Sequence, residues 1–341
     1  MNKKQKEIVF TAASLILLAL SFVLALLLGS QKFSPAQLKD VFSESPSLVK
    51  TIILSLRLPR AILAATAGAL LSASGAAFQM YFRNSLAEPG IMGISSGATL
   101  GAVIAQALGI SSLLFGSLSP INAFAFFGAV FAGIIIILIS QNQKTAGGGV
   151  TLLLCGTALG TFYAAVTSII LMTKIRQVNG LYHWILGSFN GRGWTEVRFI
   201  ILPALISMTI LIFCANRLDL LAGGETTAQA LGLETRRLRT TVLIASSLAV
   251  SAAVCAGGTI NFVGLIAPHI VRRFLGTKGK TLVGVSMIFG AVLLLISDTV
   301  ARTVIAPAEF PTGIITSLLG APFFVSLIFA GAQKHGAKDR L

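Results

Sequence analysis

The chain has 341 residues, of which 55% are hydrophobic and only 11% are charged, and its mean hydropathy is +0.88. An ordinary soluble domain carries about 25% charged residues, so this composition excludes a soluble globular protein. The net charge of +15 is spread over loops between apolar runs, which indicates solvated loops and lipid headgroups rather than nucleic acid as the partner.

Apolar windows of about 17 to 25 residues recur along the whole chain, which favours membrane-spanning helices over a barrel. We expect an all-α integral membrane protein, a polytopic bundle of ten helices in a single domain over residues 1–341. The ten spans are predicted near residues 8–29, 58–80, 91–108, 120–140, 150–172, 196–214, 240–257, 261–275, 281–300 and 312–332.

The first and eighth windows need separate comment. The first follows the basic sequence MNKKQKEIVF and is longer than the apolar region of a signal peptide, so we expect it to be retained as a span. The eighth has about fifteen residues, which reach only ~22 Å against a hydrocarbon core of ~30 Å, and Pro268 interrupts it. It is predicted to be short, broken or sheltered from lipid.

Ten spans place both termini on one side of the membrane. About sixteen of the 26 lysines and arginines fall on that side, which predicts cytoplasmic termini. The other side is also basic, and it includes Arg57, Arg60 and Arg302. Such a surface is expected either to bind an acidic partner or to consist of side chains that snorkel at span ends.

Glycines recur at intervals of four residues, at Gly93, Gly97 and Gly101 in the third span and at Gly156 and Gly160 in the fifth. This spacing allows helix backbones to approach closely. A faint similarity also links residues 87–94 (AEPGIMGI) with residues 258–265 (GTINFVGL), as an inverted repeat would.

A polar loop at about residues 216–239 interrupts the apolar pattern between the sixth and seventh spans. Gly224 precedes an acidic first turn at Glu225, and Gly232 follows Leu231, so a helix of about two turns is predicted here. A helix this short needs something to pack against. The alternatives are a partner protein and an ordinary amphipathic loop helix. The following Arg236, Arg237 and Arg239 are expected at lipid headgroups.

The sequence contains no G-x-x-x-x-G-K-[ST] motif, and residues 276–281 (GTKGKT) have only two residues between their glycines. If ATP drives transport, another chain must hydrolyse it.

The histidines are far apart in sequence, so no enzyme activity, cofactor or metal is expected in this chain. Glu88, Glu196, Asp298 and Glu309 are predicted near span ends, which disfavours an ion-coupled secondary transporter. Asp298 could pair with Arg302 four residues later.

Six segments together resemble the FecCD family, the permease subunits of ABC importers for ferric siderophores, haem and cobalamin. They are RLPR (57–60), GAAFQMYFRNSLAEPGIMGISSGA (75–98), GETTAQALG (224–232), FVGLIAPHIVRR (262–273), DTVAR (298–302) and EFPTGIITSLLGAPFF (309–324). Ser85 departs from the family pattern, which usually has proline there.

The resemblance implies a permease in a bacterial cytoplasmic membrane that works by alternating access with a second permease, two ATPase subunits that use ATP and Mg²⁺, and an extracytoplasmic substrate-binding protein. Its most common cargo is a ferric siderophore, with haem or cobalamin as alternatives. The implied ATPase-coupling residues are Gly224, Glu225, Ala228, Leu231 and Gly232, and the implied docking residues are Arg57, Arg60 and Arg302. The route would follow the dimer axis along the fifth span and the segment after it. Tyr182, His183, Trp184 and Trp194 would either touch cargo there or form an aromatic belt.

Overall fold

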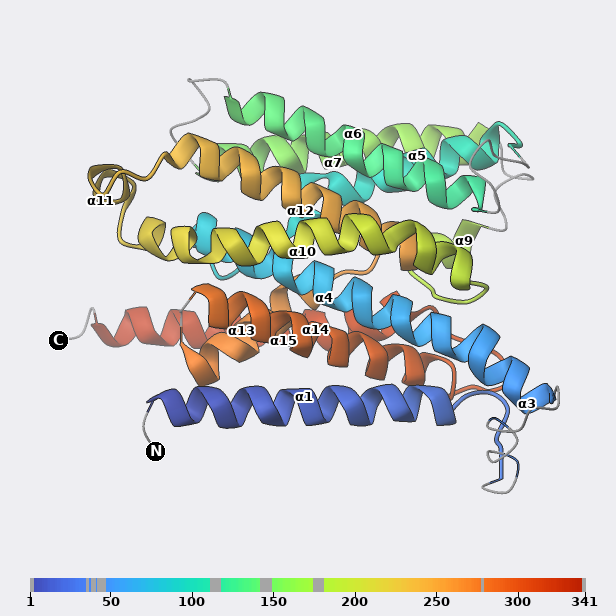
Figure 1. Ribbon diagram of the computed structural model, residues 1–341. Coiled ribbons are helices and arrows are strands. Elements are labelled where there is room, and N and C mark those ends of the chain that lie inside the picture. The colour runs from blue at the N-terminus through green and yellow to red at the C-terminus, as the bar shows by residue number, and fades with distance from the viewer. Residues whose placement is uncertain are drawn as a thin grey trace.

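The computed structural model describes residues 3–34, 37, 41, 47–110, 118–141, 149–173, 181–276 and 279–338. All ten predicted spans fall on helices, so the prediction of an all-α ten-helix bundle is confirmed (Figure 1). The helices are α1 (Lys3–Leu27), α4 (Leu58–Tyr81), α5 (Ile94–Ala107), α6 (Pro120–Gln141), α7 (Gly149–Thr173), α10 (Trp194–Ala222), α12 (Thr235–Gly257), α13 (Val263–Leu275), α14 (Gly279–Ala301) and α15 (Thr312–Lys338).

Short helices occupy the connections between these spans. They are α3 (Leu48–Thr51), the π-helix η2 (Ile52–Arg57), the 3₁₀-helix η3 (Pro89–Met92), α9 (Tyr182–Ile185) and α11 (Glu225–Ala230). Seven helical stretches among the described residues are long and apolar enough to cross a membrane. The eighth predicted span, α13, has only 13 residues, so the expectation that it is short is confirmed.

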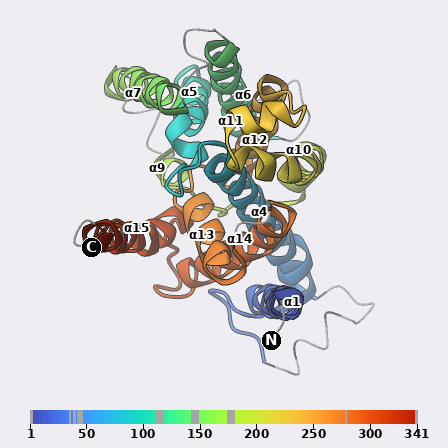
Figure 2. The ribbon, with the colours of Figure 1, turned by 90° about the vertical axis from the view of Figure 1, so that its left-hand side faces the viewer.

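Helix α4 is the central element of the bundle. Its apolar window is 83% buried, compared with 17% for α1 and for α7. Figure 2 looks along the helices and shows α4 in the middle, with α12 on one side, α13 and α14 on the other, and α1, α7 and α15 at the rim. The buried residues of α4 include many alanines and glycines, so the neighbouring helices can approach α4 closely.

The predicted glycine contacts are present. A Cβ atom on Gly97 would lie 2.9 Å from the Gly128 carbonyl oxygen of α6, and one on Gly156 would lie 2.8 Å from the Cα of Met92. In α4, a Cβ atom on Gly75 would overlap the carbonyl of Gly264 in α13. The backbones of these helices therefore touch where only glycine fits.

The two segments with similar sequences, 87–94 and 258–265, lie side by side. The carboxylate of Glu88 accepts a hydrogen bond of 2.8 Å from the backbone N–H of Phe262. Each segment leads into a short helix from a residue with left-handed backbone, Gly93 (φ 76°) before α5 and Phe262 (φ 67°) before α13. Such irregular backbone is tolerated where protein rather than lipid surrounds it. The inverted repeat itself stays a prediction.

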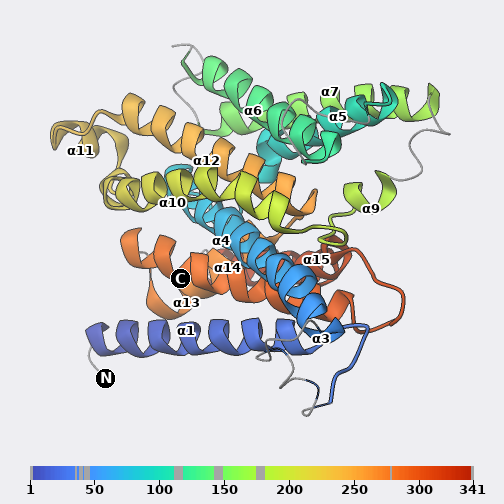
Figure 3. The ribbon, with the colours of Figure 1, turned by 45° about the vertical axis from the view of Figure 1, so that its right-hand side comes forward.

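The bundle has two distinct ends. The N-terminal end of α1, the C-terminal end of α15 and helix α11 all lie at one end, called here the α11 end (Figure 1). Helices α3 and α9 and the loop that follows α14 lie at the opposite end, the α3 end (Figure 3). This arrangement agrees with an even number of spans.

Candidate functional site

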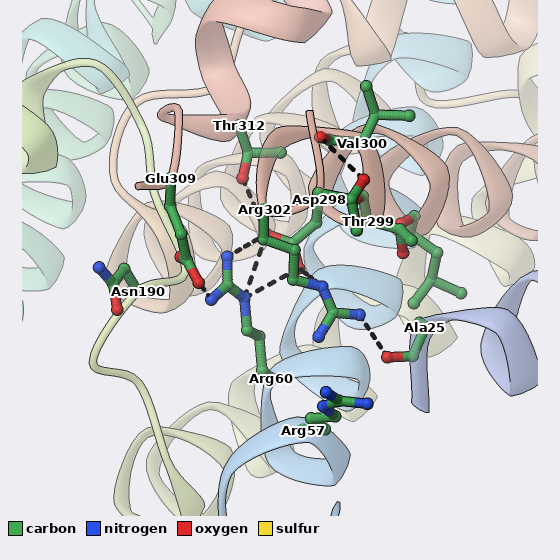
Figure 4. A network of polar contacts seen from close by, with 12 residues as sticks. Ala25, Arg57, Arg60, Asn190, Asp298, Thr299, Val300, Arg302, Glu309 and Thr312 are labelled. Atoms are coloured by element: carbon green, nitrogen blue, oxygen red, sulfur yellow. Dashed lines mark hydrogen bonds and ion pairs between the residues drawn. The ribbon is translucent and has the colours of Figure 1, made fainter. Parts of the chain in front are cut away.

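Arg60, in the first turn of α4, is the hub of a buried ionic cluster at the α3 end (Figure 4). Its Nε and Nη2 atoms donate to the two carboxylate oxygens of Asp298 in α14, both at 2.9 Å. Its Nη1 atom donates to Glu309 at 2.8 Å, and the Thr312 hydroxyl donates to Asp298 at 2.9 Å. Forked charge-assisted bonds of this kind fix geometry strongly. They join α4, α14 and the start of α15.

Two further arginines bind the C-terminal end of α1. Arg302 donates from Nη2 to the carbonyl oxygen of Ala25. Arg57 donates to three backbone carbonyls, those of Leu26 (2.8 Å), Leu27 (2.7 Å) and Gln31 (2.5 Å). The last carbonyls of a helix lack partners within the helix, and cations stabilise its negative end. Arg57 and Arg302 therefore cap α1 and hold it against α4 and α14.

The three arginines expected at an exposed docking surface are instead buried. Arg57 is 5% exposed, Arg60 is 8% exposed and Arg302 is 3% exposed. The expected pair of Asp298 with Arg302 exists at 3.8 Å, but the shorter contacts of Asp298 are with Arg60. Their role in docking stays a prediction, and in this conformation it requires some of these internal bonds to open.

A half-enclosed cavity of about 440 Å³ adjoins the cluster. Its walls come from residues 29–31, from η2 and the start of α4, and from the loop that leads from α9 into α10. Arg57, Arg60, Arg302 and Glu309 line it, and so does Arg192. Four arginines thus surround one space at the α3 end of the bundle.

At the α11 end the predicted short helix is present. Helix α11 begins after Gly224 (φ 123°) and ends before Gly232 (φ 82°), two backbone conformations that favour glycine. The Leu231 side chain is 65% exposed, whereas Ala228 is fully buried within the chain. Ala228 therefore anchors α11 and cannot be part of a contact surface in this conformation, although the family resemblance implied a coupling role for it.

Arg239 ties α11 to the end of α4. Its Nε donates to the hydroxyl of Tyr81 in α4, and its Nη2 lies 3.9 Å from Glu225 in α11. The guanidinium also lies over the Tyr81 ring, 5.6 Å from its centre. The expectation that Arg239 reaches lipid headgroups is therefore wrong, because its side chain is used inside the bundle.

The four aromatic residues after α7 divide between interior and surface. Trp184 is buried, and its indole N–H donates to Asn122 of α6 at 3.2 Å. Asn122 in turn donates to Glu196 at 3.2 Å. Trp194 donates to the carbonyl oxygen of Leu54 and is exposed, as are Tyr182 and His183. The choice between contact with cargo and an aromatic belt stays a prediction. No local pattern in the sequence indicates the contact of Trp184 with Asn122.

These features define a polytopic helical membrane protein. It has a buried central helix, a short polar helix at one end of the bundle and a cavity lined by arginines at the other end. A family model described as the FecCD transport family matches residues 17–330. The chain belongs to this family, and it is the membrane permease subunit of an ABC importer.

Individual relatives agree with this assignment. The chain is 38% identical to the cobalamin import system permease protein of Halobacterium salinarum, over 83% of this chain and 74% of the relative. It is 35% identical to the Fe(3+)-citrate import system permease protein of Bacillus subtilis, over 98% and 99% of the two chains. A solved structure described as a metal-chelate type ABC transporter in an inward-facing conformation matches with a TM-score of 0.82 and 30% identity, covering 94% of this chain and 98% of that one.

Proposed function

We propose that the cargo of this permease is a ferric chelate of the siderophore type. The observation that carries the proposal is the match of nearly the whole fold to a transporter described as metal-chelate type. The near-complete coverage of the Fe(3+)-citrate permease supports it. Helix α7 has no charged residue and exposes Thr157, Ala158, Thr161 and Ala164. A wall of this kind suits a bulky chelate that must not bind tightly.

Cobalamin is a second candidate cargo, because the identity to a named cobalamin permease reaches 38%. Both cargoes are large chelates, and both require a wide route between two permease subunits. The second subunit is either an identical chain or a sister chain.

ATP and Mg²⁺ are used by two ATPase subunits, and α11 is the element that contacts them. In this arrangement the α11 end, with both termini, faces the cytoplasm, and the α3 end faces a substrate-binding protein. The exposed Leu231 and the polar residues 225–227 supply the contact surface, while Ala228 seats the helix on the bundle. The separation of the two ends along the bundle supports this assignment (Figure 1).

The test is uptake into proteoliposomes that contain the complete transporter, with its binding protein supplied on the outside. Iron-55 siderophores, iron-55 citrate and labelled cobalamin are compared, each with and without ATP and vanadate. ATP-dependent, vanadate-sensitive uptake of a ferric siderophore is expected. Uptake of cobalamin alone would refute the cargo, and uptake that vanadate does not affect would refute the dependence on an ATPase.

A further inference from the structure

A second cavity lies at the α11 end of the bundle, between α10 and α12. Its volume is about 370 Å³, and its walls come from the last turns of α10, the connection after α11 and the first turns of α12. Among its lining residues are Arg217 of α10 and, at the start of α12, Glu234, Arg237 and Thr241. None of these four residues belongs to the predicted ATPase-coupling set, so the cavity calls for an explanation of its own.

The cavity has one more cation than it has acids. Glu234 pairs with Arg237, with 2.6 Å between its Oε2 and the Nε of the arginine. Within the part of the chain that the structure describes, no ion pair joins Arg217 to an acid. The nearby Asp219 is engaged elsewhere, because it accepts a hydrogen bond of 2.5 Å from the backbone N–H of Gly279 at the start of α14. Arg217 therefore leaves the cavity attractive to an anion.

Arg217 lies at the end of an exposed apolar face of α10. Ile206, Phe213 and Arg217 are seven and four residues apart, so they lie on the same face of the helix. Ile206 and Phe213 are exposed, and so is Ile244 on the neighbouring α12. Arg217 precedes Ala222, the last residue of α10, by five residues, or ~7.5 Å along the helix. A cation at this depth meets lipid headgroups, while the apolar face beside it meets acyl chains.

We propose that this cavity binds the phosphate of an anionic phospholipid, whose acyl chains lie along the exposed apolar face of α10. The inference rests on the proposed function in one respect, because it takes the α11 end to face the cytoplasm, where the membrane surface is negative. Arg217 offers a forked donor that suits a phosphate, and Arg237 adds a second cation beside it. Gly232 and Leu233 line the same cavity and join α11 to α12, so the bound headgroup also braces the segment that carries α11.

A lipid fits this cavity better than an acidic residue of an ATPase subunit or the cargo does. Helix α11, the proposed ATPase contact, projects beyond the ends of α10 and α12 (Figure 1). The cavity instead lies between these two helices, next to apolar surface that no ATPase would cover. Helix α7, the proposed wall of the route, lies on the other side of the bundle from α10 (Figure 2). A cargo that moves along α7 would not reach the cavity.

The experiment measures lipid binding to the complete transporter in a neutral detergent, by native mass spectrometry during titration with phosphatidylglycerol or phosphatidylcholine. Arg217→Gln is compared with Arg236→Gln, because Arg236 is exposed beside Arg237 but is not part of the cavity wall. Both variants lose one positive charge. We expect phosphatidylglycerol to bind more tightly than phosphatidylcholine. Its affinity should fall about fivefold for Arg217→Gln and change by less than about twofold for Arg236→Gln.

A variant of opposite sign separates binding from a loss of structure. Glu234→Gln removes the acid of the cavity and should tighten the binding of phosphatidylglycerol, which a misfolded chain would not do. Equal weakening by Arg217→Gln and Arg236→Gln would overturn the proposal, because diffuse surface charge would then be sufficient.

Two further measurements test the other possible occupants. Binding of inorganic phosphate that Arg217→Gln abolishes, without any preference between the two lipids, would assign the cavity to free phosphate and overturn the proposal. Loss of the ATPase subunits from the Arg217→Gln transporter, with lipid binding unchanged, would assign the cavity to the ATPase and also overturn it. If phosphatidylglycerol binds as expected but the unmodified transporter takes up no chelate, the proposed function alone fails.

Discussion

Replacement of Asp298 by asparagine tests whether the ionic cluster at the α3 end holds the bundle together. Asn keeps the shape of the side chain and one acceptor, but it removes the charge that two arginines face and turns an amide donor toward Arg60. Asp298 is only 2% exposed and accepts bonds from Arg60 and Thr312. Removing one partner of a buried pair leaves an uncompensated charge and costs about 3–5 kcal/mol.

The assay is reversible unfolding of the purified chain in mixed micelles, with Glu234→Gln as the matched control. Glu234 also pairs with an arginine, Arg237, but both side chains are more than half exposed, at 61% and 83%. Exposed pairs contribute about 0–1 kcal/mol, so the control should leave the free energy of unfolding nearly unchanged. Adding Arg60→Met to Asp298→Asn should recover only part of the loss, because it removes a cation that has lost Asp298 but also leaves Glu309 without its partner. A loss below about 1 kcal/mol for Asp298→Asn would refute the reasoning.

Three further predictions concern coupling, packing and docking. Leu231→Asp should abolish the stimulation of ATPase activity while the permease still inserts into the membrane. The control Leu108→Asp, at a residue of similar exposure in the connection after α5, should keep that stimulation. Equal ATPase stimulation in the two variants would count against coupling through α11. Gly75→Ala should lower the folded yield sharply in size-exclusion profiles, because its Cβ overlaps α13. Gly284→Ala meets no atom within 4 Å and should stabilise α14 by up to about 1 kcal/mol; similar behaviour of the two would contradict the close packing. Glu309→Gln should strengthen docking of the binding protein to the complete transporter in nanodiscs severalfold, because it removes the carboxylate that occupies Arg60, one of the arginines expected to dock it; weaker docking would speak against that competition.

The positions of the spans could be predicted from the sequence because membrane helices are set by local hydrophobic length. The same holds for α11, whose ends are marked by Gly224 and Gly232 in adjacent sequence. The close packing of α5 on α6 and of α7 on η3 followed from the four-residue glycine spacing. In each case the information lies within a few turns of the chain.

The arrangement of the arginines could not be predicted in this way. Arg60 meets Asp298 across 238 residues of sequence, and Arg302 meets Ala25 across 277 residues. No local pattern distinguishes an arginine that snorkels from one that caps a distant helix. The only hint in the sequence was that Asp298 and Glu309 are predicted near the same side of the membrane. Acids near span ends are common and often pair with a neighbour in sequence, so this hint does not identify a distant arginine as their partner.

The cap at the end of α1 has a consequence for how the protein is made. Helix α1 is synthesised before α4 and α14, yet one of the two arginines that bind its final carbonyls follows Ala25 by 277 residues. Helix α1 therefore lacks one of its final partners until Arg302 has left the ribosome. Truncated nascent chains that end before α14 should consequently leave α1 free to cross-link to lipid or to the insertion machinery, and chains that extend past Arg302 should withdraw it.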